Sequence, residues 1–229
     1  MGKLVFIVAK SGMGKSTSLR NLSPDETVII NTDQKPLPFR KSSELYSEEK
    51  GNYLQTSSIS ATLDKLRDVS KNQKHINAFV IDTWSRIMTD FVMSKQFRKS
   101  QGFEKWGEFN GAMYDLLNLI NDKVRDDLTV YLFCHPTTVH DEAGFPQERI
   151  AVQGKQLEKF SPESFSSMVL YAEILHAPGQ PNEHIFRIVN SGADTCKTPM
   201  GMFTDEDDVQ LEAIPNDLTI VQKAIKEYF

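Results

Sequence analysis

Four runs of apolar residues in the first part of the chain are each followed directly by polar residues. They lie at residues 4–8, 26–31, 75–82 and 128–134. Runs this apolar are typical of strands that are buried on both faces of a parallel sheet. The pattern therefore predicts four central strands that bring the polar residues after them to one edge of the sheet.

The segments between and after these runs carry the spacing of amphipathic helices. Leu63, Leu66 and Val69 share one helical face, as do Met113, Leu116 and Ile120. Helices are expected at residues 15–22, from Ser58 or Ser60 onward, at 84–99, at 109–125 and at 217–228. Strands that alternate with helices predict a parallel sheet with helices on both faces and right-handed connections.

Shorter polar and apolar alternations predict further strands. A short strand is expected at 52–55, one β-hairpin at 137–140 and 149–152, and a second at 168–176 and 184–189. Residues 34–51 show no periodicity and are expected to form an irregular loop. We predict an α/β fold in one domain, residues 1–229, with a mostly parallel central sheet flanked by helices and a C-terminal β-hairpin extension.

The first apolar run passes directly into a glycine-containing stretch that reads Ala9-Lys10-Ser11-Gly12-Met13-Gly14-Lys15-Ser16-Thr17. A strand, a glycine-containing loop and a helix that begins with Lys-Ser are the parts of a phosphate-binding loop, or P-loop. The ordinary alternative is a turn that joins a buried strand to an amphipathic helix. The residues predicted to bind the nucleotide are Ser11, Gly12, Met13, Gly14, Lys15, Ser16 and Thr17.

Each residue type in this loop has a physical role in holding a triphosphate. Gly12 and Gly14 can adopt backbone angles that let successive N–H groups surround a phosphate. Lys15 is long enough to reach the β- and γ-phosphates, and the Ser16 hydroxyl can bind Mg²⁺. Ala9 stands where the GxxxxGK[ST] pattern has its first glycine, which we expect to matter little because the later glycines form the cradle.

Asp82 ends the apolar run 75–82, which is the pattern of a Walker B motif. A carboxylate at the end of a buried strand can bind the Mg²⁺ of a nucleotide held by a P-loop, usually through water. Ser16 and Asp82 are therefore the predicted metal residues. The alternative is that Asp82 caps the helix expected to begin near Trp84.

Two other strand ends supply candidate catalytic groups. Thr83 occupies the position after Asp82 where many P-loop ATPases carry the acid that activates water, so Asp33 is the candidate base. The aspartate side chain is one methylene shorter than that of glutamate, which predicts slow turnover. The alternative is that Asp33 only forms a turn. His135 is placed to contact the γ-phosphate, or is simply satisfied in the loop before Pro136.

Lys155 is a fourth catalytic candidate, in the Gly154-Lys155 pair after the first predicted hairpin. A lysine there is expected to reach the γ-phosphate bound to a neighbouring subunit, as trans-acting basic fingers do. The ordinary alternative is a solvated surface lysine.

Composition and charge limit the partners and the compartment. The 229 residues carry a net charge of −5 and an isoelectric point near 5.6, so binding to nucleic acid or anionic membranes would need a local basic surface. Cys134 and Cys196 show no metal-type spacing and are expected to be reduced thiols. No segment resembles a signal peptide or a membrane span, which predicts a cytoplasmic protein that does not bind membranes.

Taken together, these motifs resemble the RecA-like core ATPases of bacteriophages, the Sak-type single-strand annealing recombinases. The shared features are the P-loop, Asp33, the stretch 79–83, the strand end at Cys134-His135 and Gly154-Lys155, and the likeness extends to about Met202. Only the P-loop and the stretch around Asp82 are specific. The resemblance implies ATP and Mg²⁺ as cofactors, a homo-oligomer with ATP near subunit interfaces, and binding of single-stranded DNA during strand annealing.

By the same resemblance, loops after the Walker B strand hold the DNA. The candidates are His140, Phe145 and Arg149 in the first hairpin, and the segment 191–202 with Lys197. Aromatic side chains there would stack on bases and basic ones would neutralise phosphates, and two ordinary surface loops are the alternative. A second basic and aromatic stretch lies at residues 95–106.

Two other function classes fit the same P-loop. A nucleotide or small-molecule kinase would need an arginine-rich lid over both substrates, and Arg149 and Arg187 are isolated in the sequence. A non-hydrolysing protein would instead use ATP as a switch for assembly.

Overall fold

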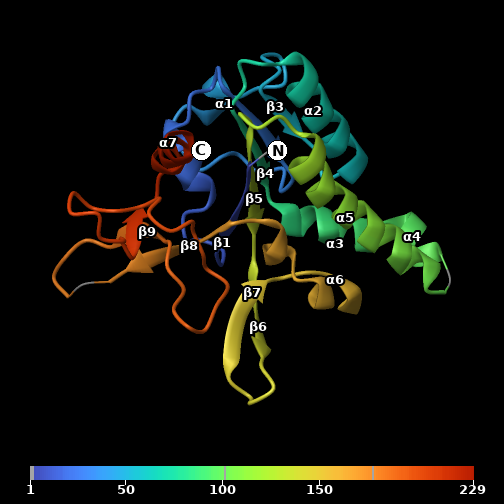
Figure 1. Ribbon diagram of the computed structural model, residues 1–229. Helices are drawn as coiled ribbons and strands as arrows, with labels where there is room; N and C mark the ends of the chain where they lie inside the picture. The colour runs from blue at the N-terminus through green and yellow to red at the C-terminus, as the bar shows by residue number, and fades with distance from the viewer. Residues whose placement is uncertain (1–2, 101, 177) are drawn as a thin grey trace.

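The computed structural model describes residues 3–100, 102–176 and 178–229, and the side chains of residues 155, 156 and 158 lie outside this description. An eight-stranded sheet runs through the molecule in the order β10-β9-β8-β1-β5-β4-β2-β3 (Figure 1). The strands are β1 (Lys3–Val8), β2 (Thr27–Asn31), β3 (Tyr53–Gln55), β4 (Ala78–Asp82), β5 (Thr129–Cys134), β8 (Met168–Leu175), β9 (Glu183–Arg187) and β10 (Ala213–Pro215).

The strands from β8 to β3 in this order are parallel, and β9 and β10 continue the sheet antiparallel to their neighbours. The P-loop strand β1 lies beside β5, which separates it from β4 and its Asp82. The predicted fold class is confirmed: the central sheet is mostly parallel, and the chain adds an antiparallel hairpin of β8 and β9 near its C-terminus.

Both faces of the sheet are covered, because successive residues of a strand point to opposite sides. Phe6 and Val8 pack with Trp84 in a core that includes α2 (Ile59–Asn72), α3 (Trp84–Met93) and α5 (Glu104–Lys123). On the other face, Val5 and Ile7 pack with η1 (Ser16–Asn21) and α7 (Leu218–Tyr228). Figure 1 shows α3 and α5 on one side of the sheet and α7 on the other.

A separate two-stranded hairpin projects from the carboxyl end of β5 (Figure 1). Its strands are β6 (Pro136–His140) and β7 (Pro146–Ile150), and α6 (Lys155–Phe160) and η2 (Pro162–Phe165) follow. The predicted hairpin is confirmed, although its second strand begins at Pro146 rather than at residue 149.

Several helices differ from the prediction for local reasons. The single helix expected at 84–99 is divided, because the Ser94 hydroxyl accepts a hydrogen bond from the Phe97 N–H (3.1 Å) and starts α4 (Lys95–Lys99). The helix after the P-loop is a 3₁₀ helix, because the Ser18 hydroxyl donates to the Lys15 carbonyl (2.5 Å). The loop 34–51 contains the short α1 (Ser42–Leu45). None of the described helices is long and apolar enough to cross a membrane.

The two outermost strands of the sheet are also its shortest. β3 and β10 have three residues each, and β10 ends in Pro215. Directly after β10, the Asp217 carboxylate accepts from the Thr219 N–H (3.0 Å) and begins α7. The C-terminal helix therefore returns over the sheet beside η1.

Candidate functional site

The carboxyl ends of the parallel strands meet in a polar cavity of about 310 Å³. The strand register aligns these ends, because Val8 pairs with Cys134 and Asn31 pairs with Asp82. Residues of the P-loop line one wall, and the connection after β2 lines another. The lining residues are Lys10, Ser11, Gly12, Gly14, Lys15, Ser16, Thr17, Asn31, Asp33, Lys35, Pro36, Leu37, Pro38, Asp82, Thr83 and His135.

The P-loop adopts the backbone that its glycines permit. Gly12 and Gly14 have φ angles of +85° and +93°, which side chains with a Cβ rarely adopt. At Gly14 a Cβ would also lie 3.0 Å from Nδ1 of His184, so the loop packs closely against β9. These positions explain why glycine is needed there, as the sequence predicts.

Lys15 is buried within this loop, with 7% of its surface exposed. Its ammonium donates to the carbonyl oxygens of Ala9 and of Lys10, the latter at 3.1 Å. Burial lowers the pKa of Lys15, and the nearby Asp82 partly opposes that shift. The ammonium thus lies at the loop, where an anion would relieve the cost of its burial.

Ser16 and Asp82 lie together, as predicted for a Mg²⁺ site. Asp82 is 5% exposed, and burial raises the pKa of its carboxyl to about 6. A hydrogen bond from the Ser16 side chain lowers that pKa in part, while the nearby Asp33 raises it further. Hydroxyl and carboxylate oxygens are the ligands that Mg²⁺ prefers, so this pair fits the ion that the motif implies.

Asp33 and Thr83 are joined to the site through the ends of β2 and β4. The Thr32 hydroxyl accepts from the Thr83 N–H (2.6 Å) and donates to the Thr83 carbonyl (2.9 Å). The Thr32 N–H donates to the Asp82 carbonyl (2.8 Å). These bonds hold Asp33, the next residue, at the cavity wall, where its carboxylate faces solvent in part.

His135 also lines the cavity, and its place follows from β5. The backbone N–H of His135 donates to the Ser85 hydroxyl (3.0 Å). Burial, and then the charge of Lys15, lower the pKa of His135, whereas a hydrogen bond to the Ala9 backbone raises it. The imidazole is therefore neutral at neutral pH, and its single N–H is the donor in the hydrogen bond to the Ala9 backbone.

Two predicted site residues behave differently from the rest. The Met13 side chain packs against the core under η1 and α7, so only its backbone belongs to the loop. Lys155 begins α6, but its side chain lies outside the described residues. Gly154 before it packs on Trp106, where an added Cβ would lie 3.0 Å from the indole ring.

The sequence did not indicate three residues that the structure brings to the cavity. Asn31 lines it from the end of β2, and Lys35 lines it from the connection that follows, within the stretch that was expected to be irregular. Lys10 forms an ion pair with Glu148 of β7 (3.5 Å), which joins the P-loop to the β6–β7 hairpin. No sequence signal marks these residues, because their positions depend on contacts across the fold.

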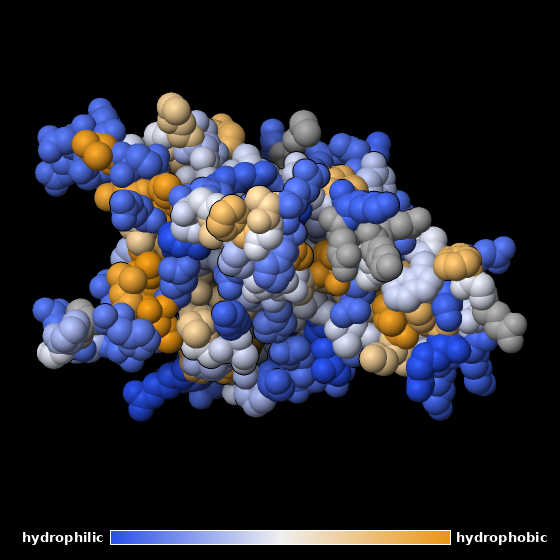
Figure 2. Space-filling view, turned by 90° about the horizontal axis from the view of Figure 1, so that it is seen from below, coloured by the Kyte–Doolittle hydropathy of each residue, from blue (hydrophilic) through white to orange (hydrophobic). Residues whose placement is uncertain are grey.

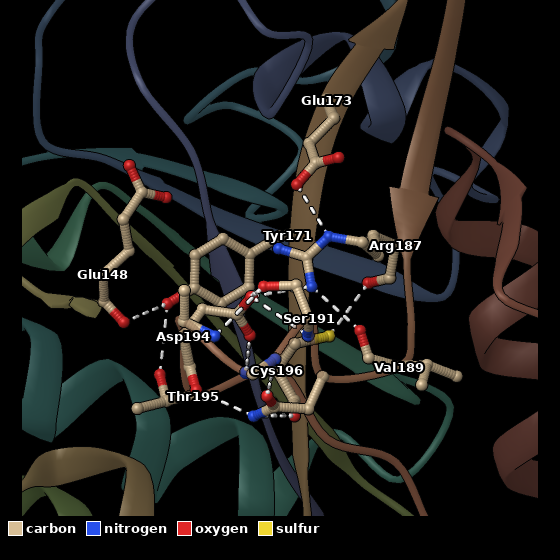
Figure 3. Close-up of polar contacts among 12 residues, drawn as sticks. Glu148, Tyr171, Glu173, Arg187, Val189, Ser191, Asp194, Thr195 and Cys196 are labelled. Carbon is tan, nitrogen blue, oxygen red and sulfur yellow. Dashed lines mark hydrogen bonds and ion pairs between the residues drawn. The ribbon is translucent and has the colours of Figure 1, made fainter. Parts of the chain in front are cut away.

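A second group of polar side chains lies among β8, β9 and the segment after β9 (Figure 3). We call it the C-terminal polar cluster: Tyr171, Glu173, Arg187, Asp194 and Thr195. Arg187 bonds both Glu173 (2.8 Å) and Asp194 (2.9 Å). The Tyr171 hydroxyl contacts Thr195 (3.1 Å) and donates to the Glu148 carbonyl (3.1 Å), which links the cluster to the hairpin.

The two predicted DNA loops therefore lie against each other. The Glu148 N–H donates to the Ala193 carbonyl at 2.8 Å. Phe145 at the hairpin tip is 68% exposed, whereas Lys197 is half-buried, with its backbone paired to Val169. Seen from below, the molecule is mostly hydrophilic, and hydrophobic side chains gather on the side of β8 and β9 (Figure 2).

Comparison with known proteins agrees with the motifs. The family AAA_24, described as an AAA domain, matches residues 1–198. A KaiC-like protein from Pyrococcus horikoshii shares 13% identity and a TM-score of 0.45, over 81% of this chain and 78% of that one. The flagellar accessory protein FlaH from Methanocaldococcus jannaschii shares 10% identity and a TM-score of 0.45, over 93% and 84%.

No curated protein has significant sequence similarity to the chain. The AAA_24 match spans the P-loop, every residue that lines the cavity and the β6–β7 hairpin. The chain therefore belongs to the AAA domain family AAA_24.

Proposed function

We propose that the chain is a Mg²⁺-dependent ATPase of RecA-like architecture. One observation carries this proposal: Lys15, Ser16, Asp33, Asp82 and His135 come from four different strand ends and line a single cavity. A nucleotide-binding turn without chemistry would need only the P-loop. The additional acid, histidine and metal pair are the groups that hydrolysis requires.

In this proposal the P-loop amides and Lys15 stabilise the charge that develops on the γ-phosphate. Asp33 orients the attacking water and accepts its proton, and the neutral imidazole of His135 donates its one N–H to a γ-phosphate oxygen in place of the Ala9 backbone. Ser16 and Asp82 would hold Mg²⁺, which when bound would neutralise charge on the phosphates. We expect slow turnover, because the Asp33 side chain is short.

Release of phosphate from ATP by the purified protein tests the proposal directly. We expect release that requires Mg²⁺, falls by about 10²-fold to 10³-fold in Lys15→Ala, and falls by about 10²-fold in Asp33→Asn, whose amide cannot accept a proton. ATP binding without phosphate release would instead support an assembly switch. Release that requires an added phosphate acceptor would support a kinase, although Arg149 and Arg187 contact Gln147 and Glu173 rather than the cavity.

We further propose that the hairpin and the loop beside it bind single-stranded DNA, as in the Sak-type recombinases of phages. The exposed Phe145 offers a surface for stacking, and His140 is exposed on the same hairpin. The Lys10–Glu148 ion pair gives this surface a contact with the P-loop. Asp141 and Glu142 at the tip oppose phosphate, so we expect stacking to contribute more than charge.

Binding of fluorescent oligothymidylate, with and without ATP, tests the DNA proposal. Phe145→Ala should weaken binding by about 1–3 kcal/mol, the usual value of one stacked base. Phe103→Ala is the matched control, because Phe103 is also highly exposed but lies before α5, away from the hairpin. A loss in Phe103→Ala with no loss in Phe145→Ala would move the site to residues 95–106, and no binding in either state would exclude the DNA role.

We also propose that the chain forms a homo-oligomer in which Lys155 reaches the ATP of a neighbouring subunit. Mixing two inactive variants, Lys155→Ala and Asp82→Asn, tests this. Mixed oligomers contain intact metal sites beside intact lysines and should recover part of the activity. Activity retained by Lys155→Ala alone, or no recovery on mixing, would contradict the proposal.

A further inference from the structure

The connection after β2 forms the wall of the cavity that faces the P-loop. Lys35, Pro36, Leu37 and Pro38 all line the cavity. Lys35 is the only one of these four with a charge. It is therefore a second lysine, besides Lys15, that could meet the far end of a bound triphosphate.

The backbone of Lys35 is held in place from beneath. Asn31, which is 2% exposed, donates from its amide to the Lys35 carbonyl (2.6 Å) and contacts the Tyr53 hydroxyl (2.6 Å). Its amide oxygen accepts from the Gln34 N–H (3.1 Å), and Gln34 has a φ of 56°. Leu37 is buried in the core below the loop. This connection is thus an anchored turn with a defined position.

The side chain of Lys35, by contrast, is mostly exposed and weakly held. It is 79% exposed, and its one ion pair among the described residues is a long one, 4.0 Å, with Asp33. An exposed pair of this length is worth at most about 1 kcal/mol, so it does little for the fold. Lys10, the other exposed lysine of the cavity, is different because it is paired with Glu148 across the hairpin.

The charge of Lys35 reaches the catalytic groups around it. Burial is the largest cause of the pKa shifts of Asp82 and His135, and the Lys35 charge lowers the pKa of both. Asp82 and His135 line the same cavity as Lys35, where the proposed function places the γ-phosphate.

We propose that Lys35 is a second catalytic lysine, which leaves Asp33 for the γ-phosphate when a triphosphate binds. This inference rests on the proposed ATPase function. The move neutralises the γ-phosphate oxygens and releases the Asp33 carboxylate to hold the attacking water. The water oxygen then bonds to the γ-phosphorus as its proton passes to Asp33, the bond from the γ-phosphorus to the bridging β-phosphate oxygen breaks, and ADP leaves with that electron pair. Lys35 itself makes and breaks no covalent bond.

The test compares Lys35→Ala, Lys35→Arg and the control Lys41→Ala, a neighbouring exposed lysine that does not line the cavity. Each is measured for binding of ATP and ADP with Mg²⁺ and for single-turnover phosphate release. We expect Lys35→Ala to bind ADP as the wild type does, to lose about threefold to tenfold in ATP affinity, and to react about tenfold to a hundredfold more slowly. Lys35→Arg should keep most of the ATP affinity and most of the rate of phosphate release.

The outcomes separate this inference from the function on which it rests. If ATP and ADP affinities fall equally in Lys35→Ala, or if neither affinity nor rate changes relative to Lys41→Ala, Lys35 has no role at the γ-phosphate. If the wild type hydrolyses nothing but Lys35→Ala still loses ATP affinity selectively, the lysine contact holds and the ATPase proposal fails. If the wild type binds no nucleotide, both fail.

Discussion

Polar and charged side chains gather in two parts of this molecule that differ in how well partners satisfy them. In the C-terminal polar cluster, Arg187 bonds Glu173, Asp194 and the Val189 carbonyl. In the cavity at the P-loop, the hydrogen-bond partners of Lys15 among the described residues are two carbonyl oxygens, and burial opposes its charge. Burial likewise raises the pKa of Asp82.

This difference distinguishes polar side chains that stabilise the fold from polar side chains that can bind a ligand. A cluster in which every charge is paired fixes the positions of chain segments, and it leaves little interaction free for a ligand. A cavity whose charges are costly to hold can recover that cost when a ligand of opposite charge binds. Variants of the cavity should therefore lose activity, and variants of the C-terminal polar cluster should lose stability.

The largest effect is expected at Lys15. Replacing it by alanine removes the cation nearest the phosphates and should lower ATP turnover by about 10²-fold to 10³-fold. The melting temperature should stay the same or rise, because a buried charge is removed. Phosphate release and thermal unfolding on the same sample check both parts. A large loss of stability would mean that Lys15 is structural.

Arg187→Ala should give the opposite result. It leaves Asp194, whose side chain is 3% exposed, without its cation, and should lower the free energy of unfolding by about 2–4 kcal/mol. Urea unfolding measures this, with Glu173→Gln as a milder control because Glu173 is 38% exposed. Once folded, the variant should keep its turnover. Loss of turnover without loss of stability would instead show that the cluster takes part in catalysis.

The raised pKa of Asp82 predicts a pH dependence in the ligand-free protein. The folded state holds this proton up to about pH 6, whereas the unfolded state holds it only to about pH 4. The free energy of unfolding should therefore fall as the pH rises from about 4 to about 6. The total is on the order of 2–3 kcal/mol. Unfolding of wild type and Asp82→Asn across this range measures it, and the asparagine variant should lack this decrease. Parallel curves would contradict the shift.

The smallest of these effects separates the two P-loop glycines. Gly12→Ala and Gly14→Ala both place a Cβ at positive φ, which costs about 1–2 kcal/mol, but only Gly14 also faces His184. Gly14→Ala should therefore be the less stable of the two in thermal unfolding. Adding His184→Ala should recover that extra loss. Equal losses of stability in the two variants, without recovery by His184→Ala, would show that the contact with β9 does not contribute to stability.

Much of the fold could be predicted because its central strands are encoded locally. β1, β2, β4 and β5 are short apolar runs, and parallel strands place their carboxyl ends together. This alone brought Lys15, Asp33, Asp82 and His135 into one cavity. The three-residue β10 escaped prediction because its strand character comes from pairing with β9 and not from its own pattern.

The missed residues of the site share a different cause. Lys35 sits in a stretch without periodicity, and its position depends on the Asn31 amide. Lys10 and Glu148 are separated by most of the domain and meet only after the hairpin folds back. The pairs of the C-terminal polar cluster likewise join separate strands and loops. Such pairings need the three-dimensional structure, because no local pattern of residues records them.

The short outermost strands have a consequence for how copies of this chain can associate. A long free strand invites another chain to add to the sheet, which leads to aggregation. β3 and β10 expose only three residues each, and the proline at the end of β10 has no N–H to offer. Any assembly should therefore be built through loops and side chains, and that leaves the backbone of the sheet closed to neighbours.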